Sequence, residues 1–116
     1  MSRQIAVSVK DYFKLSNQID QYSKSLIKEK GEEYSLRNDF LAMENKIAGI
    51  KDEHPALVSL TLASKHIAAM FVMLEKSDPK VIKLEKWDER IRDGINLLKI
   101  ASAFVHAEHE TFDLRR

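Results

Sequence analysis

Apolar side chains recur every three or four residues along most of this chain, which is the spacing of one face of an α-helix. The first such segment covers residues 9 to about 30, and Gly31 is expected to end it. A polar turn follows, after which Asn38 or Asp39 is expected to cap a short helix that continues to Ile50. The amino-terminal half therefore predicts one long helix and one short helix.

Two prolines mark helix starts in the second half of the chain. Pro55 lies in the first turn of a helix that is expected to run to about Lys76. Pro79 follows a Ser-Asp cap and opens a last helix, expected over residues 80–106 or beyond. No stretch alternates as a β-strand does. The pattern predicts an all-α fold, a small bundle of about four main helices in a single domain covering residues 1–116.

The third predicted helix has a second interpretation as a membrane span. Residues 56–74 are mostly apolar and long enough to cross a bilayer. Lys65 and His66 lie at the centre, where an ionisable side chain is costly in lipid, and flanking aromatic belts are missing. A helix that is apolar nearly all round is also typical of the central helix of a small bundle. We therefore expect no membrane association.

Composition narrows the classes of function. The chain has no cysteine, which excludes disulfides, thiolate catalysis and Cys-ligated zinc. Its net charge is +1, so charge gives no reason to expect a nucleic-acid partner. With 44% hydrophobic and 32% charged residues, a packed core is feasible. The first residues lack the long apolar run of a signal peptide, so a cytoplasmic location is expected.

Three stripes run along the last predicted helix when its residues are placed about 100° apart. One stripe is apolar and contains Trp87, Ile91, Ile95 and Leu98. A second is polar and is expected to face solvent: Asp88, Arg92, Lys99 and His106. The third begins with polar residues and ends with apolar ones: Glu89, Asp93, Asn96, Ile100 and Phe104. Its two carboxylates thus lie at a boundary or in a second interface, where they need a partner.

Two interpretations of this stripe stay open. The acids are either boundary residues, with Glu89 paired to a neighbouring Lys or Arg, or ligands of a metal ion. A second acidic group surrounds Tyr34 within residues 28–40, and it is either a solvated helix end or a second set of oxygen ligands. Lys65 either extends to water or meets one of these carboxylates or a ligand phosphate. Carboxylates on two helices would suit Mg²⁺ and pyrophosphate chemistry.

Four segments, taken in chain order, carry a family resemblance: KGEEYS, RNDF, SKHIAAM and ERIRDGINLL. Together they resemble the small phage-encoded MazG-like proteins of the all-α nucleotide pyrophosphohydrolase superfamily, over roughly residues 26–105. The resemblance implies a nucleotide ligand and Mg²⁺ as cofactor. It implies metal ligation and catalysis by Glu33, Glu89 and Asp93. It also implies substrate contacts from Tyr34, Lys65, His66 and Asn96.

The chain departs from the family pattern in its acidic residues. Hydrolases of the superfamily usually carry a Glu-x-x-Glu pair on an early helix, whereas Glu32 and Glu33 are adjacent here. Two functions are therefore expected. The first is Mg²⁺-dependent cleavage of a nucleoside triphosphate to a monophosphate and pyrophosphate. The second is a non-catalytic module on the same fold, which binds or sequesters a nucleotide or contacts another protein in phage–host conflict.

Apolar surface predicts assembly. The last helix has two apolar arcs, and the third helix is apolar nearly all round. One small bundle cannot easily bury both, and exposed apolar stripes usually mark interfaces. A homodimer or a higher homo-oligomer with closed symmetry is expected, as the resemblance also implies.

Overall fold

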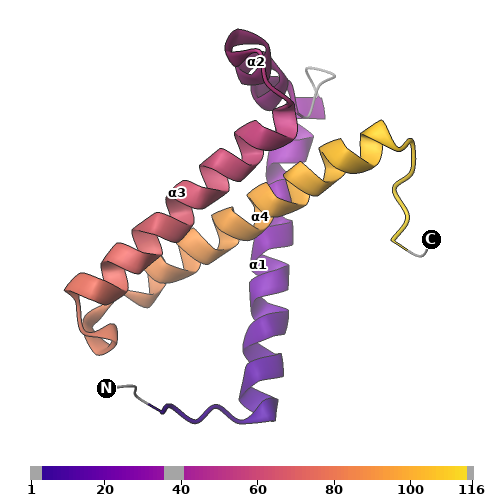
Figure 1. Cartoon of the computed structure of the whole chain (residues 1–116). Helices are drawn as coiled ribbons and strands as arrows, with labels where there is room; N and C mark the ends of the chain where they lie inside the picture. Colours follow the sequence, from indigo (N-terminus) through magenta and orange to yellow (C-terminus); the bar gives the residue numbers. More distant parts are fainter. Residues whose placement is uncertain (1–3, 36–40, 115–116) are drawn as a thin grey trace.

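The computed structural model describes residues 4–35 and 41–114, and of residues 30–35 and Ala42 it describes the backbone alone. Within these ranges the chain is all-helical, and it contains no β-strand. Its elements are α1 (Val9–Ser35), α2 (Ala42–Lys51), α3 (Pro55–Lys76), the 3₁₀ helix η1 (Pro79–Val81) and α4 (Leu84–Glu108). The predicted all-α class with four main helices is confirmed (Figure 1).

The expected ends of the first two helices need correction. α1 does not end at Gly31 but continues through it to Ser35. A glycine inside a helix costs only about 1 kcal/mol, which the rest of a long helix can offset. α2 begins after Leu41, whose side chain makes no capping hydrogen bond. The predicted caps Asn38 and Asp39 lie outside the described residues.

The two proline signals have different outcomes. Pro55 occupies the start of α3 as predicted, and His54 caps that helix by accepting a hydrogen bond from the Ala56 amide at 3.1 Å. The prediction that the last helix begins near residue 80 is wrong. Asp78 accepts a hydrogen bond from the Lys80 amide at 2.9 Å, which caps the 3₁₀ helix instead, and α4 starts four residues later.

α3 and α4 form the best-packed part of the molecule. They run antiparallel and side by side, and α1 crosses α4, passing behind it in the view of Figure 1. The buried residues of the two helices are mostly small: Ala56, Val58, Ser59, Ala63, Gly94, Asn96 and Ala101. Small side chains let two helix backbones approach each other, so α3 and α4 make this contact without large apolar residues at its centre.

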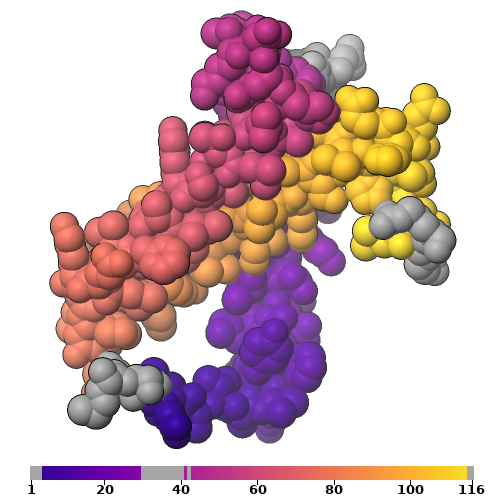
Figure 2. Space-filling model, viewed as in Figure 1, coloured from indigo at the N-terminus to yellow at the C-terminus, as the bar shows by residue number. Residues whose placement is uncertain are grey.

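Large apolar side chains remain on the outside of the chain. The radius of gyration is 16.9 Å, whereas a compact domain of this length has about 13 Å. The accessible surface is 9474 Å², whereas a compact protein of 13.4 kDa exposes about 6,500 Å². Figure 2 shows the open arrangement: the first half of α1 stands away from the α3–α4 pair. A single copy therefore leaves much apolar surface in contact with water.

α3 is long and apolar enough to cross a membrane by length and composition alone. Its most apolar 18-residue window has a mean hydropathy of 1.7, and 17% of that window is buried. One such helix is weak evidence, because the core helices of other proteins meet the same criteria. Lys65 at its centre is exposed.

Candidate functional site

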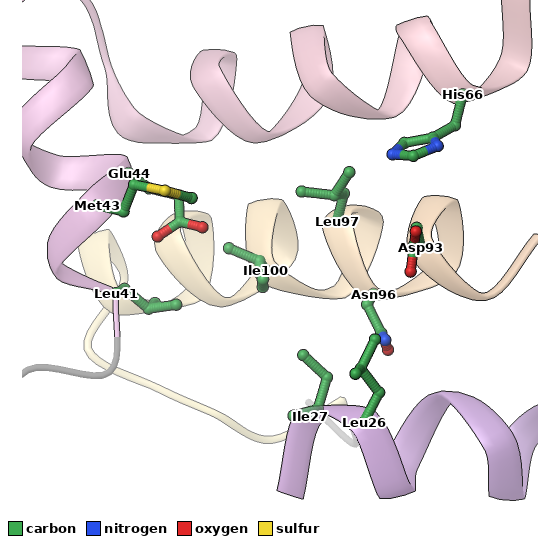
Figure 3. Close-up of a pocket in the computed structure, with 10 residues that line it drawn as sticks. All are labelled: Leu26, Ile27, Leu41, Met43, Glu44, His66, Asp93, Asn96, Leu97 and Ile100. Atoms are coloured by element: carbon green, nitrogen blue, oxygen red, sulfur yellow. The ribbon is translucent and has the colours of Figure 1, made fainter. Parts of the chain in front are cut away.

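A pocket of about 180 Å³ lies where all four main helices meet (Figure 3). Its apolar walls come from Leu26, Ile27, Leu41, Met43, Leu97 and Ile100. Its polar side chains are Glu44, His66, Asp93 and Asn96. The structure thus brings three of the sequence-predicted site residues together, since His66 comes from α3 and Asp93 and Asn96 come from α4.

Asn96 is the most unusual residue of this pocket. Its side chain points from α4 towards α1 and ends beside Leu26 (Figure 3). It is 4% exposed, and neither Oδ1 nor Nδ2 has a hydrogen-bond partner among the described residues. Each buried polar group left without a partner costs about 1–3 kcal/mol. An unpaired amide in a pocket is open to a ligand, and a free acceptor beside a free donor suits a planar polar edge.

Arg92 fixes the position of Asp93 and joins α4 to α1. Its Nε donates a hydrogen bond to Asp93 Oδ1 at 2.8 Å, and its Nη1 donates one to the Tyr22 hydroxyl, also at 2.8 Å. The guanidinium carbon lies 4.7 Å from the centroid of the Tyr22 ring. The hydrogen bond to Asp93 raises the pKa of Arg92 above its ordinary value and outweighs the opposing effect of partial burial.

The prediction that Arg92 faces solvent is therefore wrong. Its side chain is only 18% exposed, because α1 crosses α4 at this point and Tyr22 covers the guanidinium group. Periodicity placed Arg92 on a polar stripe of α4, but it carried no information about the helix that packs there. The contact joins residues 70 positions apart in the chain.

Glu44 is a pocket residue that sequence reasoning missed. It is 6% exposed and lies in the first turn of α2. Among the described residues, no cation forms an ion pair with it. A signal was present in the sequence, because Leu41, Ile47 and Ala48 lie three or four positions away and make Glu44 an acid on an apolar helix face.

The neighbours Lys65 and His66 have different environments. His66 lines the pocket, its ring lies on the side of α3 that faces Asp93, and its Nδ1 lies 3.2 Å from Arg90 Nη1 (Figure 3). Lys65 is exposed and does not line the pocket. Adjacent side chains of a helix point about 100° apart, so a pocket on one side of α3 is lined by only one of these two side chains.

Of the predicted metal ligands, the structure describes the side chains of Glu89 and Asp93, and Glu89 does not line the pocket. Glu89 Oε2 lies 4.0 Å from Lys86 Nζ on the surface of α4, as the interpretation of a boundary acid expects. The side chains of Glu33 and Tyr34, in the last turns of α1, lie outside the described residues. In the part of the chain that the structure describes, no three His, Asp or Glu side chains are grouped to hold a metal ion.

A second pocket of about 320 Å³ adjoins the first and shares Ile27, Leu41, Asn96 and Ile100 with it. Three lysines line this second pocket: Lys24, Lys28 and Lys99. Lys24 and Lys28 are one helical turn apart on α1, and Lys99 comes from α4. The lining of this pocket is almost wholly apolar, so the three exposed lysines contribute mainly their aliphatic stems to it.

No family model, no curated protein and no solved structure matches this chain. The candidate site therefore rests on its geometry and on the sequence resemblance described above.

Proposed function

We propose that this chain is a MazG-like nucleotide-binding protein. In this proposal the base enters the pocket beside Asn96, and the phosphates lie over the neighbouring pocket with its three lysines. The observation that carries the proposal is the buried, unpaired amide of Asn96, which lines both pockets. A cytoplasmic location and a phage origin belong to the proposal through the sequence resemblance.

The shape and chemistry of the first pocket support a planar, partly polar ligand. Its walls are apolar, and its polar groups are few and come from α2, α3 and α4. Binding pockets for small molecules commonly combine apolar walls with a few polar groups that fix orientation. A nucleobase presents donors and acceptors side by side on one edge. Such an edge would supply hydrogen-bond partners for both the donor and the acceptor of the Asn96 amide.

The three exposed lysines around the second pocket support an anionic group next to that ligand. Lys24, Lys28 and Lys99 belong to two helices and line the same pocket as Asn96. Lysine binds phosphate as a flexible point charge, and several lysines around one concavity concentrate positive potential there. Charge from side chains thus offers the phosphates a partner that does not depend on a metal ion.

Mg²⁺-dependent pyrophosphohydrolysis is the second candidate function, supported by the carboxylates of Asp93 and Glu44 in the same pocket. The described donor set does not by itself fit Mg²⁺, which prefers six oxygen ligands in octahedral geometry. Of the two implied ligands whose side chains the structure describes, Glu89 does not line the pocket and Asp93 does, and Arg92 already occupies one oxygen of Asp93. We therefore derive no reaction step through the metal and place binding first.

Calorimetric titration with a panel of nucleoside triphosphates tests the binding proposal. Asn96→Leu keeps a similar volume and removes the unpaired amide. We expect the variant to be more stable by about 1–3 kcal/mol and to bind its nucleotide at least about tenfold more weakly. Asn17→Leu makes the same change on an exposed part of α1 and should alter neither quantity. Unchanged affinity in a folded Asn96→Leu protein would refute the assignment.

The phosphate side of the site has its own matched test. Replacing Lys24 and Lys28 by Gln should weaken triphosphate binding more than nucleoside binding, and the loss should shrink at high salt. Lys10 and Lys14 have the same spacing on the exposed first half of α1, so their Gln variants serve as the control. If both pairs of Gln substitutions lowered triphosphate affinity equally, the effect would be one of non-specific charge.

Pyrophosphate release measured with and without Mg²⁺ separates the two candidate functions. The hydrolase requires Mg²⁺-dependent release that Asp93→Asn abolishes. If the protein only binds nucleotides, it should bind at least one nucleotide of the panel and release no pyrophosphate from any of them. In the binder, nucleotide sequestration is the role that the resemblance implies.

A further inference from the structure

Glu44 is a buried acid in the first pocket. It is 6% exposed, and among the described residues no hydrogen bond or ion pair holds its carboxylate. Figure 3 shows this carboxylate directed from α2 towards α4, with Ile100 between it and Asn96 in that view. A carboxylate removed from bulk water needs hydrogen-bond donors or a cation. A ligand in the pocket can supply them.

The charges around the two pockets orient a bound nucleotide. Asn96 lines both pockets, whereas Glu44 lines only the first and the three lysines line only the second. Phosphates carry negative charge, so the lysines attract them and Glu44 repels them. In the binding mode proposed above, the edge of the base that is farthest from its sugar therefore points towards Glu44. In a purine this is the Watson–Crick edge.

A carboxylate distinguishes the bases by the donors on this edge. It accepts hydrogen bonds and donates none, and its two oxygens can take two parallel N–H groups. Guanine carries N1–H next to the exocyclic N2 amino group, so two adjacent donors face the acid. Adenine and cytosine place an amino group beside a ring-nitrogen acceptor, and uracil places one N–H between two carbonyl oxygens. Each of these three bases sets an acceptor against the carboxylate, which is repulsive.

We propose that the first pocket selects guanine nucleotides and that Glu44 determines this specificity. The carboxylate of Glu44 accepts hydrogen bonds from guanine N1–H and from one N–H of the N2 amino group. Asn96 holds the base at the boundary with the second pocket. The inference rests on the nucleotide-binding function proposed above. The apolar walls strengthen both hydrogen bonds and raise the free-energy cost of an unpaired polar group when another base binds.

A metal ion fits Glu44 less well. Asp93 is the other carboxylate of the pocket, and one of its oxygens already accepts a hydrogen bond from Arg92. No three His, Asp or Glu side chains are grouped around an ion within residues 4–29, 41 and 43–114, whose side chains the structure describes. Mg²⁺ prefers six oxygen ligands, whereas a guanine edge needs only one carboxylate. Cation binding by Glu44 is therefore an alternative outcome of the experiments below.

Calorimetric titration of the parent protein with GTP, ITP, ATP, CTP and UTP tests the specificity. ITP lacks only the 2-amino group of GTP, so it leaves one oxygen of Glu44 without a donor. We expect GTP to bind most tightly and ITP to bind at least about tenfold more weakly. ATP, CTP and UTP should bind more weakly still, because each sets an acceptor against the carboxylate. These comparisons need no variant protein, so they do not depend on how a substitution affects folding.

Glu44→Gln tests whether this residue is the cause. Glutamine keeps the size of the side chain but replaces one acceptor by a donor. GTP affinity should fall at least about tenfold, and the preference for GTP over ITP should shrink to less than about threefold. Glu75→Gln is the matched control, because Glu75 is exposed on α3 and lines neither pocket, and it should alter neither quantity. Circular dichroism verifies that both variants keep their helices.

Several results would overturn the guanine assignment. They are equal affinity of the parent for GTP and ITP, tighter binding of ATP, CTP or UTP, or a preference for GTP that Glu44→Gln leaves intact. If the preferred nucleotide still lost affinity in Asn96→Leu protein, the proposed nucleotide-binding function would stand without the guanine assignment. Absence of binding to every nucleotide would refute both. Binding of MgCl₂ alone that Glu44→Gln abolishes would assign Glu44 to a cation instead.

Discussion

The α3–α4 pair and the first half of α1 have similar apolar periodicity but opposite burial. Along the pair, Ala63 is 1% exposed, and Gly94 and Ala101 are also buried. Along the first half of α1, the large side chains are exposed: Val9, Tyr12, Phe13 and Leu15. Ser16 and Ile19 of α1 are half-buried, and Ser23 is its first fully buried residue. Ser23 directly follows Tyr22, whose hydrogen bond with Arg92 is here called the clasp.

The difference shows that size and position together decide burial. Small residues on facing helices allow the backbones to approach and to exclude water where α3 and α4 meet. The large residues of α1 would gain hydrophobic free energy on burial. Tyr12 and Leu15 line a pocket of about 200 Å³ with Ile95 of α4, yet each stays more than half exposed. A stripe of large exposed residues therefore indicates surface available to another molecule, whereas the small residues mark the contact made within the chain.

The largest expected effect comes from overfilling the α3–α4 contact. Ala63→Leu adds three carbon atoms at a site that is 1% exposed, which should lower the free energy of unfolding by an amount towards the upper end of about 1–3 kcal/mol. Ala107→Leu, at an exposed position of α4, should change it by less than about 0.5 kcal/mol. Urea denaturation measures both, and equal effects would contradict the packing described for α3 and α4.

Arg92→Lys should have the next largest effect. Lysine keeps the charge but loses the planar fork that reaches Asp93 and the Tyr22 hydroxyl together, so stability should fall by about 1–1.5 kcal/mol. Tyr22→Phe removes only one of the hydrogen bonds. In a double-mutant cycle the two losses should not add, and full additivity would show that the clasp does not form in solution.

Gly94→Ala should stabilise the protein slightly. Gly94 is buried within α4, yet a Cβ atom placed on it meets nothing within 4 Å. The substitution should therefore raise the free energy of unfolding by about 0.5–1 kcal/mol through the helix preference of alanine. A thermal melt that shows destabilisation would mean that α3 and α4 approach more closely at this residue than the structure shows.

The smallest effect is expected in the first half of α1. Phe13 is 58% exposed, so Phe13→Ser should change the stability of one copy by less than about 0.5 kcal/mol. The measurement belongs at dilutions where sedimentation shows a monomer. A loss above 1 kcal/mol there would show that this half of α1 packs against its own chain after all.

Much of the fold could be predicted from apolar periodicity and from the residues that start and end helices. The all-α class, the start of α3 at Pro55 and its end at Lys76 follow from local rules, because helix capping and proline geometry depend on near neighbours in the chain. Gly31 and Pro79 show the limit of such rules. α1 continues through the glycine, and the proline opens a 3₁₀ turn before α4.

For the candidate site, the sequence by itself determined which residues share a stripe, and only the tertiary structure decided what covers each stripe. Asp93 and Asn96 followed from angles on one helix. The burial of Asn96, the entry of Glu44, the separation of His66 from Lys65 and the clasp on Arg92 did not. The physical reason is that periodicity fixes a direction around a helix axis, whereas burial depends on another helix brought to that direction from a distant part of the chain.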